Sequence, residues 1–237
     1  MDWFDSDYYH LLYKNRDYNE ARNFINNIIK HTSLKKGSKI LDLACGIGRH
    51  SIYLEKIGYK VTGIDRSANN IKIAKTKQNK NLRFLKMEMT CDSKLKYDAI
   101  FNLFTSFGYL NHKYNLDTIK NIGMQLNQDG LVIIDFMNVE FVKKNLIRDE
   151  VKKVENITFK IKRNFDQKYI YKDIRFKDKK NEHFKERVMN LGLEDFKFYL
   201  QKNDFKIVEL FGNYELESFD IEKSQRLIML IKKSQSK

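Results

Sequence analysis

The feature that most constrains this chain is a buried-strand pattern that runs directly into a glycine-rich turn. The segment LDLACGIGRH places Gly46 and Gly48 between an expected strand at residues 39–43 and an expected helix from about His50 to Ile57. A strand that leads through glycines into a helix lets backbone amide groups approach a ligand at the helix N-terminus. The turn therefore predicts a ligand site at the C-terminal end of a parallel strand.

Strand and helix patterns alternate through the first 138 residues of the chain. Further strand patterns stand at residues 60–65, 83–86, 98–103 and 131–136, and helical patterns stand at residues 18–31, 67–77 and 115–126. Ser67 is a suitable N-terminal cap for one of these helices, and Gly58 is a natural end for the helix before it. Such alternation is typical of an α/β fold in which helices cover both faces of a parallel sheet.

The pattern changes after residue 138. Short runs of alternating apolar residues between 157 and 189, with the turn signal DKKN, indicate an antiparallel meander of about three strands. A helix at residues 193–202 and strands at 205–211 and 226–231 follow. We therefore expect a seven-stranded, mostly parallel sheet that is closed at one edge by the final antiparallel strand. The meander is expected to lie over the C-terminal ends of the strands as a partial lid.

Two kinds of ligand fit a glycine-rich turn, and the acidic residues near it separate them. A dinucleotide fingerprint needs a third glycine at the position of Ser51, and the carboxylate of Asp42 would oppose a pyrophosphate. S-adenosylmethionine carries an ammonium and a sulfonium, so an acidic residue at position 42 favours it. Asp65, at the end of the second strand, is placed to accept hydrogen bonds from both ribose hydroxyls of a nucleoside.

The segment LDLACGIGRHSIYLEKIGYKVTGID resembles the cofactor-binding motif of class I S-adenosylmethionine-dependent methyltransferases, which have a Rossmann-like fold. The similarity continues through RFLKMEMT, YDAIFNLFTSFGYL and GLVIIDFMN, and so covers about residues 37–138 closely. Ala44 is a departure, because many members have glycine at that position. The resemblance implies that Glu88 and Met89 lie against the adenine. The full set of expected cofactor-binding residues is Tyr13, Arg16, Asp42, Ala44, Cys45, Gly46, Gly48, Asp65, Arg66, Glu88, Met89 and Leu103.

The beginning of the chain adds a narrower resemblance. Residues 9–16 look like the N-terminal cap of aminosugar N,N-dimethyltransferases, in which an aromatic residue at the position of Tyr13 closes over the methionine part of the cofactor. The inserted meander is also similar to that group, which implies a small-molecule substrate. The implied organisation is a helical cap at residues 1–36, a methyltransferase core at 37–140 and 191–237, and an inserted antiparallel lid at 141–190. Arg16 is placed to meet the cofactor carboxylate, although it also fits an ordinary surface arginine.

Methyl transfer from a sulfonium depends on alignment more than on acid–base chemistry, because the leaving group is already activated. Tyr109 and His112 follow the fourth strand, where an acceptor is expected, and are the candidate catalytic residues. Tyr109 stands where the aminosugar enzymes have a histidine that faces the sugar, so the resemblance does not fix the substrate. We expect an amine or a hydroxyl of a small metabolite as the acceptor. The histidines show no metal-binding spacing, and no metal is expected.

The formal net charge of +14 makes nucleic acid an alternative partner. Of the basic residues, 35 are lysine and 10 are arginine, which favours a solvated surface over phosphate or base recognition. Methyltransferases that act on exocyclic base amines carry an Asn/Asp-Pro-Pro-aromatic motif after the fourth strand, and this chain contains no proline. Neither Cys45 nor Cys91 is well placed as the nucleophile for cytosine C5 methylation. An RNA methyltransferase and a non-catalytic cofactor-binding module remain the alternatives.

The remaining expectations concern cellular context. The acidic start of the chain lacks the pattern of a secretory signal, and no apolar stretch reaches the length of a membrane span. We expect a cytoplasmic protein with no membrane partner, present as a monomer or a homodimer.

Overall fold

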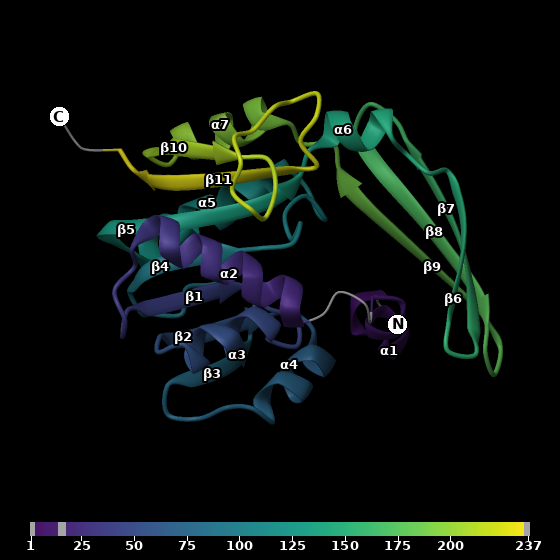
Figure 1. Ribbon diagram of the computed structural model, residues 1–237, viewed down its shortest axis with the longest axis horizontal. Coiled ribbons are helices and arrows are strands. Elements are labelled where there is room, and N and C mark those ends of the chain that lie inside the picture. The colour runs from purple at the N-terminus through teal and green to yellow at the C-terminus, as the bar shows by residue number, and fades with distance from the viewer. Residues whose placement is uncertain (1–2, 14–17, 235–237) are drawn as a thin grey trace.

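The computed structural model describes residues 3–13 and 18–234 and shows a seven-stranded main sheet beside a separate four-stranded sheet (Figure 1). The strand order of the main sheet is β10-β11-β5-β4-β1-β2-β3. Its strands are β1 (Lys39–Leu43), β2 (Lys60–Asp65), β3 (Leu82–Lys86), β4 (Tyr97–Asn102), β5 (Leu126–Met137), β10 (Phe205–Phe211) and β11 (Arg226–Lys233). Strands β1 to β5 are parallel, which confirms the predicted fold class.

The final strand lies in a different place from the one we expected. β11 runs antiparallel to both β5 and β10 and stands between them, so β10 forms the edge of the main sheet. The expectation of a closing final strand was therefore wrong by one position. The reason is that β11 is almost wholly buried along Leu227–Ile231, and a strand covered on both faces is more stable inside a sheet than at its edge.

Helices cover both faces of the main sheet, as predicted. The helices of the core are α2 (Tyr18–Thr32), α3 (Arg49–Lys56), α4 (Ala68–Lys75), α5 (His112–Gln125), α6 (Val139–Lys144) and α7 (Leu193–Gln201). One apolar cluster joins one face of the sheet to α5 and α7, and a second joins the other face to α2, α3 and α4.

Local capping explains where two of these helices begin. The side chain of Ser67 accepts a hydrogen bond from the backbone N–H of Asn70 at 3.0 Å, which starts α4 where the sequence predicted. The side chain of Asn111 accepts from the N–H of Tyr114 at 2.9 Å. Helix α5 therefore begins at His112, three residues earlier than expected from the apolar spacing.

The inserted region forms a small sheet of four antiparallel strands, where we expected about three. Its strands are β6 (Asp149–Val154), β7 (Ile157–Phe165), β8 (Tyr169–Lys177) and β9 (Asn181–Met189), in that spatial order. The missed strand, β6, has the sequence DEVKKV and no buried residue, so it lacks the apolar alternation that marks its neighbours.

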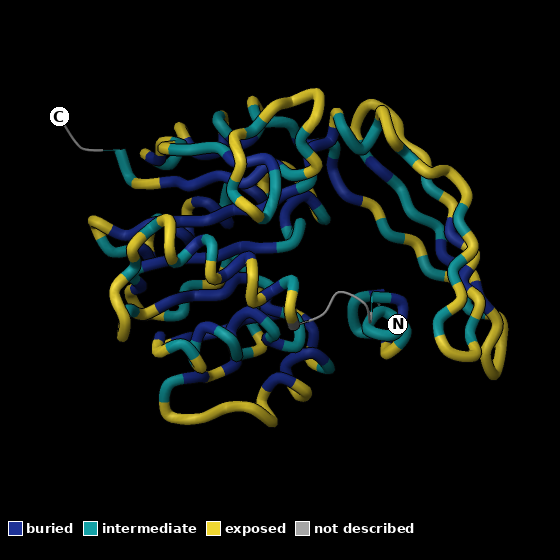
Figure 2. The backbone as a smooth tube through the Cα atoms, in the orientation of Figure 1, coloured by how far each residue is buried: buried dark blue, intermediate teal, exposed yellow. Residues whose placement is uncertain are grey.

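The small sheet packs on the beginning of the chain. Residues 3–13, which we call the N-terminal segment, contain a short 3-10 helix (Trp3–Asp5) and helix α1 (Asp7–Leu12). Trp3 and Leu12 are buried against Phe159 and Phe176 of the small sheet, and Figure 1 shows α1 between this sheet and the core. Figure 2 shows that the outer strands of the small sheet are largely exposed, whereas the middle of the main sheet is buried.

Candidate active site

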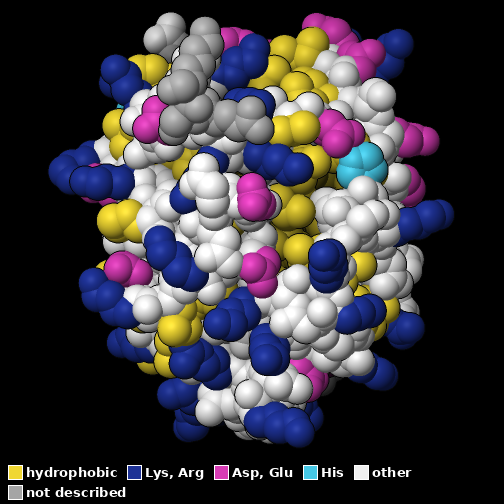
Figure 3. Space-filling model, turned by 90° about the vertical axis from the view of Figure 1, so that its left-hand side faces the viewer, with side chains coloured by type: hydrophobic (Ala, Val, Ile, Leu, Met, Phe, Trp, Pro, Cys, Tyr) yellow, Lys and Arg dark blue, Asp and Glu magenta, His cyan; other side chains and the backbone are white. Residues whose placement is uncertain are grey.

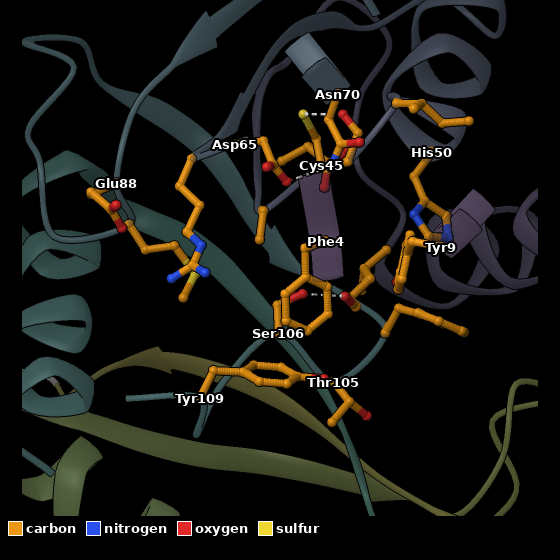
Figure 4. A pocket seen from close by; sticks show the side chains of 18 of the residues that line it. Phe4, Tyr9, Cys45, His50, Asp65, Asn70, Glu88, Thr105, Ser106 and Tyr109 are labelled. Atoms are coloured by element: carbon orange, nitrogen blue, oxygen red, sulfur yellow. Dashed lines mark hydrogen bonds between the residues drawn. The ribbon is translucent and has the colours of Figure 1, made fainter. Parts of the chain in front are cut away.

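A cavity of about 440 Å³ lies at the C-terminal ends of the main-sheet strands, beneath the N-terminal segment. Figure 4 shows Asp65 and Cys45 at one end of this cavity and Thr105 and Tyr109 at the other. The residues that line it include Phe4, Tyr9, His10, Tyr13, Asp42, Ala44, Cys45, Gly46, Arg49, His50, Asp65, Arg66, Asn70, Glu88, Met89, Leu103, Phe104, Thr105, Ser106, Tyr109 and Tyr114. Ten of the twelve predicted cofactor residues are thus brought together here.

The glycine-rich turn has the backbone that its sequence predicted. Gly46 and Gly48 both have positive φ, +57° and +84°. A Cβ on Gly48 would lie 2.6 Å from the ring of Phe84, so this glycine permits close packing rather than lining the cavity. Ala44 has a φ of +58°, which explains why a glycine is easily accommodated at this position.

Asp42 is a buried carboxylate at the cavity wall. Only 1% of the residue is exposed, and its Oδ2 accepts a hydrogen bond from the Ser51 hydroxyl. Burial raises the pKa of Asp42 to about 7; the nearby charge of Asp65 acts in the same direction, and the Ser51 bond opposes it. The residue that breaks the dinucleotide fingerprint, Ser51, is therefore the one that fixes this carboxylate.

Asp65 is held at the end of β2 by two backbone groups. Its Oδ2 accepts from the N–H of Gly46 and its Oδ1 from the N–H of Ser67, each at 2.8 Å. Burial raises its pKa, while these two hydrogen bonds and Arg66 oppose the rise. The carboxylate is thereby oriented toward the cavity without rotational freedom.

Tyr114 is a lining residue that the sequence did not reveal. It lies on α5, and its hydroxyl donates a hydrogen bond to Oε2 of Glu88 at 2.8 Å. Burial and this bond raise the pKa of Tyr114. The adjacent Met89 also lines the cavity, and its sulfur accepts a hydrogen bond from the side-chain amide of Asn102 at 3.3 Å.

The N-terminal segment forms the roof of the cavity. Phe4, Tyr9 and His10 join the predicted Tyr13 there, and Nε2 of His10 lies 2.8 Å from Oδ1 of Asn70 on α4. The aromatic spacing of this segment was a signal for these residues, although it did not show which of them faces inward. Arg16 lies outside the described residues.

Of the two candidate catalytic residues, Tyr109 lines the cavity and His112 does not. The ring of Tyr109 lies at the far end of the cavity, 5.0 Å between centroids from the ring of Phe4. His112 is exposed at the start of α5, does not line the cavity, and contacts the hydroxyl of Tyr199 through Nδ1. The structure therefore places His112 outside the cavity lining, at the first position of α5, and its catalytic role stays a prediction.

The loop after β4 forms the floor and is anchored from two other strands. Phe104 and Thr105 have positive φ, +69° and +56°. The backbone N–H of Phe104 donates to Oδ2 of Asp135 at 2.8 Å, and Nη2 of Arg226 donates to the hydroxyl of Thr105 at 3.0 Å. Arg226 and Asp135 form a buried ion pair with a separation of 2.6 Å. A strained loop is thus fixed by a charged pair beneath it.

None of the described residues of the small sheet lines the cavity. Phe159 and Phe176 of the small sheet pack on the N-terminal segment instead. Among the described residues, no three His, Cys, Asp or Glu side chains come together as a metal site would require. Within the same part of the chain, no helix has the length and apolar character of a membrane span.

Comparison with known proteins places this geometry in a family. A family model described as a methyltransferase domain matches residues 13–210. An uncharacterised protein of Methanocaldococcus jannaschii is 29% identical over 211 residues, which cover 86% of this chain and 74% of that protein. The chain spans about half the length of other curated relatives that are described as putative methyltransferases.

Solved structures share the fold at low sequence identity. An S-adenosylmethionine-dependent methyltransferase from Clostridium acetobutylicum has a TM-score of 0.81 and 19% identity, and the match covers 96% of each chain. An amino pentose methyltransferase from Micromonospora echinaspora, with its cofactor bound, has a TM-score of 0.73 and 14% identity. That match covers 97% of this chain and 98% of the other.

Proposed function

We propose that this chain, which belongs to the class I S-adenosylmethionine-dependent methyltransferases, transfers a methyl group to an amine or a hydroxyl of a small metabolite. S-adenosylmethionine is the methyl donor of this family, and when bound it supplies an electrophilic methyl group on sulfur. The observation that carries the proposal is one covered cavity with an acidic end and an aromatic end.

The acidic end fits the cofactor. Asp42 is a buried carboxylate whose raised pKa reflects poor solvation, so a cationic ligand beside it would stabilise the charged form. Asp65 points a fixed carboxylate into the cavity for ribose hydroxyls, and a Cβ on Gly46 would meet no atom within 4 Å, so the turn leaves open space. We infer that Asp42 and the turn hold the methionine part, Asp65 the ribose, and Glu88 and Met89 the adenine.

The aromatic end fits a compact acceptor. Its rings are those of Phe4, Tyr9, Tyr13, Phe104 and Tyr109. These rings would exclude water from the reacting groups. Aromatic faces also stabilise a nitrogen that gains positive charge as it is methylated. These contacts, together with the roof formed by the N-terminal segment, favour a small amine over a polymer.

The face of the molecule opposite the cavity offers no support for the RNA alternative. Figure 3 shows Lys and Arg side chains scattered among Asp and Glu on the face opposite the cavity, without a continuous basic groove. A dispersed distribution of this kind is what a solvated lysine surface produces.

The test combines binding with methyl transfer. Calorimetry measures cofactor affinity, and labelled methyl transfer is followed separately into a small-metabolite extract and into bulk RNA and protein. We expect micromolar or tighter binding and label in small molecules. Cofactor binding with no transfer to any fraction would indicate a non-catalytic module, and label in RNA alone would establish the alternative enzyme.

A further inference from the structure

A largely buried pair of opposite charges stands behind the aromatic end of the cavity. Lys172 on β8 and Glu186 on β9 are register partners on the inner face of the small sheet. Their side chains are only 14% and 15% exposed, and Nζ of Lys172 lies 3.9 Å from Oε2 of Glu186. This separation is too long for a hydrogen bond, so the attraction is purely electrostatic.

Each member of the pair contacts one tyrosine of the cavity wall. The hydroxyl of Tyr109 donates to Oε1 of Glu186 at 3.4 Å. Nζ of Lys172 contacts the hydroxyl of Tyr13 and lies 4.5 Å from the centroid of its ring. Through these two contacts the small sheet reaches the aromatic end of the cavity, which we call the acceptor end because the acceptor is proposed to bind there. None of the described residues of the small sheet lines the cavity itself.

Glu186 retains an unused hydrogen-bonding capacity. Its Oε2 is buried and accepts no hydrogen bond from the residues that the structure describes. A buried carboxylate oxygen without a donor is costly, which is a reason to expect a functional role. Burial also lowers the pKa of Lys172, whereas Glu186 acts to raise it. The two groups are therefore held in a poorly solvated position by the fold.

We propose that Glu186 is a positioning residue that acts through Tyr109 and makes the acceptor end selective for a primary or secondary amine. This inference rests on the proposed function and narrows it. Because Tyr109 donates its proton to Glu186, its oxygen lone pairs are left to accept an N–H from the acceptor. That hydrogen bond turns the nitrogen lone pair toward the methyl donor.

The charge of Glu186 gives the selectivity. The acceptor reacts as the neutral amine: its nitrogen lone pair forms the new carbon–nitrogen bond while the carbon–sulfur bond breaks and its electron pair stays on sulfur. The methylated nitrogen becomes an ammonium, which keeps its proton and which the carboxylate behind Tyr109 stabilises. A hydroxyl acceptor, in contrast, would need a base to remove its proton.

The experiment uses the full chain with labelled methyl donor and a small-metabolite extract, and it separates basic from non-basic labelled products by cation exchange. We expect label in basic, N-methylated products. Glu186→Gln should lower that label about 10- to 100-fold with cofactor affinity unchanged, since a hydrogen bond to a charged group is lost. Glu182→Gln is the matched control, because Glu182 lies on the same face of β9 with an 18% exposed side chain.

A double variant separates positioning from a structural effect. If Glu186 acts through Tyr109, Glu186→Gln should cause less than a twofold further loss in a Tyr109→Phe background, whereas independent effects would multiply. Tyr109→Phe alone also tests the inference should Glu186→Gln fail to fold. Label in small, non-basic O-methylated products, multiplicative losses, or full activity of Glu186→Gln would overturn the inference and leave the proposed function standing. Label in macromolecules alone would overturn both.

Discussion

We expect the affinity for S-adenosylmethionine to fall about tenfold between pH 8 and pH 6, because Asp42 must be ionised to hold a cationic ligand. The pKa of Asp42 is about 7 without a ligand, raised chiefly by burial. A bound cation lowers this pKa, so binding below pH 7 must release a proton. At pH 6 about nine-tenths of the side chains are protonated, which costs about 1.4 kcal/mol in binding relative to pH 8.

Isothermal calorimetry across this range, in buffers of different ionisation enthalpy, measures both the affinity and the proton release. Asp42→Asn is the matched variant, since it keeps the size of the side chain and an acceptor for Ser51. Titration of the ligand's own amine affects both proteins equally. The ratio of the two affinities should therefore change about tenfold between pH 8 and pH 6. A ratio that stays constant with pH would refute the role assigned to Asp42.

Three further predictions follow from the geometry. Asp65→Ala should weaken cofactor binding by about 2 to 4 kcal/mol in calorimetry, because charged acceptors are lost; unchanged affinity would argue against ribose recognition. Gly48→Ala should lower the free energy of unfolding, measured in urea, by about 2 to 4 kcal/mol, because its Cβ would clash with the ring of Phe84. Gly37 also has positive φ but lies in open space, so Gly37→Ala should cost only about 1 to 2 kcal/mol. Arg226→Met should cost about 3 to 5 kcal/mol of unfolding free energy by leaving Asp135 buried and unpaired, and equal stability would show that the pair is unimportant.

The acidic end of the cavity could be predicted from the sequence because its determinants are local. Strand β1, the turn to Gly48 and the cap at Ser67 each depend on residues that are close together in the chain. Asp42 and Asp65 end neighbouring parallel strands, and the parallel register brings strand ends to the same edge of a sheet. Once the strands and the turn were predicted correctly, the parallel sheet was sufficient to bring Asp42 and Asp65 together.

The aromatic end of the cavity could not be predicted in the same way, because its residues come from segments that are far apart in the sequence. Phe4 contacts Tyr109, and the N-terminal segment that carries Phe4 is held by its packing on the small sheet. Tyr114 faces the cavity because of the rotation of α5, which its cap sets. His112 lies two residues earlier on the same helix, about 200° around its axis, and points elsewhere. The sequence pattern began this helix at residue 115, so helical spacing could not be applied to either residue.

The position of β11, which the sequence placed at the edge, has a consequence for the cavity floor. Arg226 is the first residue of β11 and pairs in register with Met137, beside Asp135 on β5. Only a strand adjacent to β5 brings a guanidinium within reach of both that carboxylate and the hydroxyl of Thr105. The positive φ angles of Phe104 and Thr105 cost about 1 to 2 kcal/mol each, and the ion pair of Arg226 and Asp135 offsets this strain. The insertion of β11 between β5 and β10 thus determines the shape of the cavity floor.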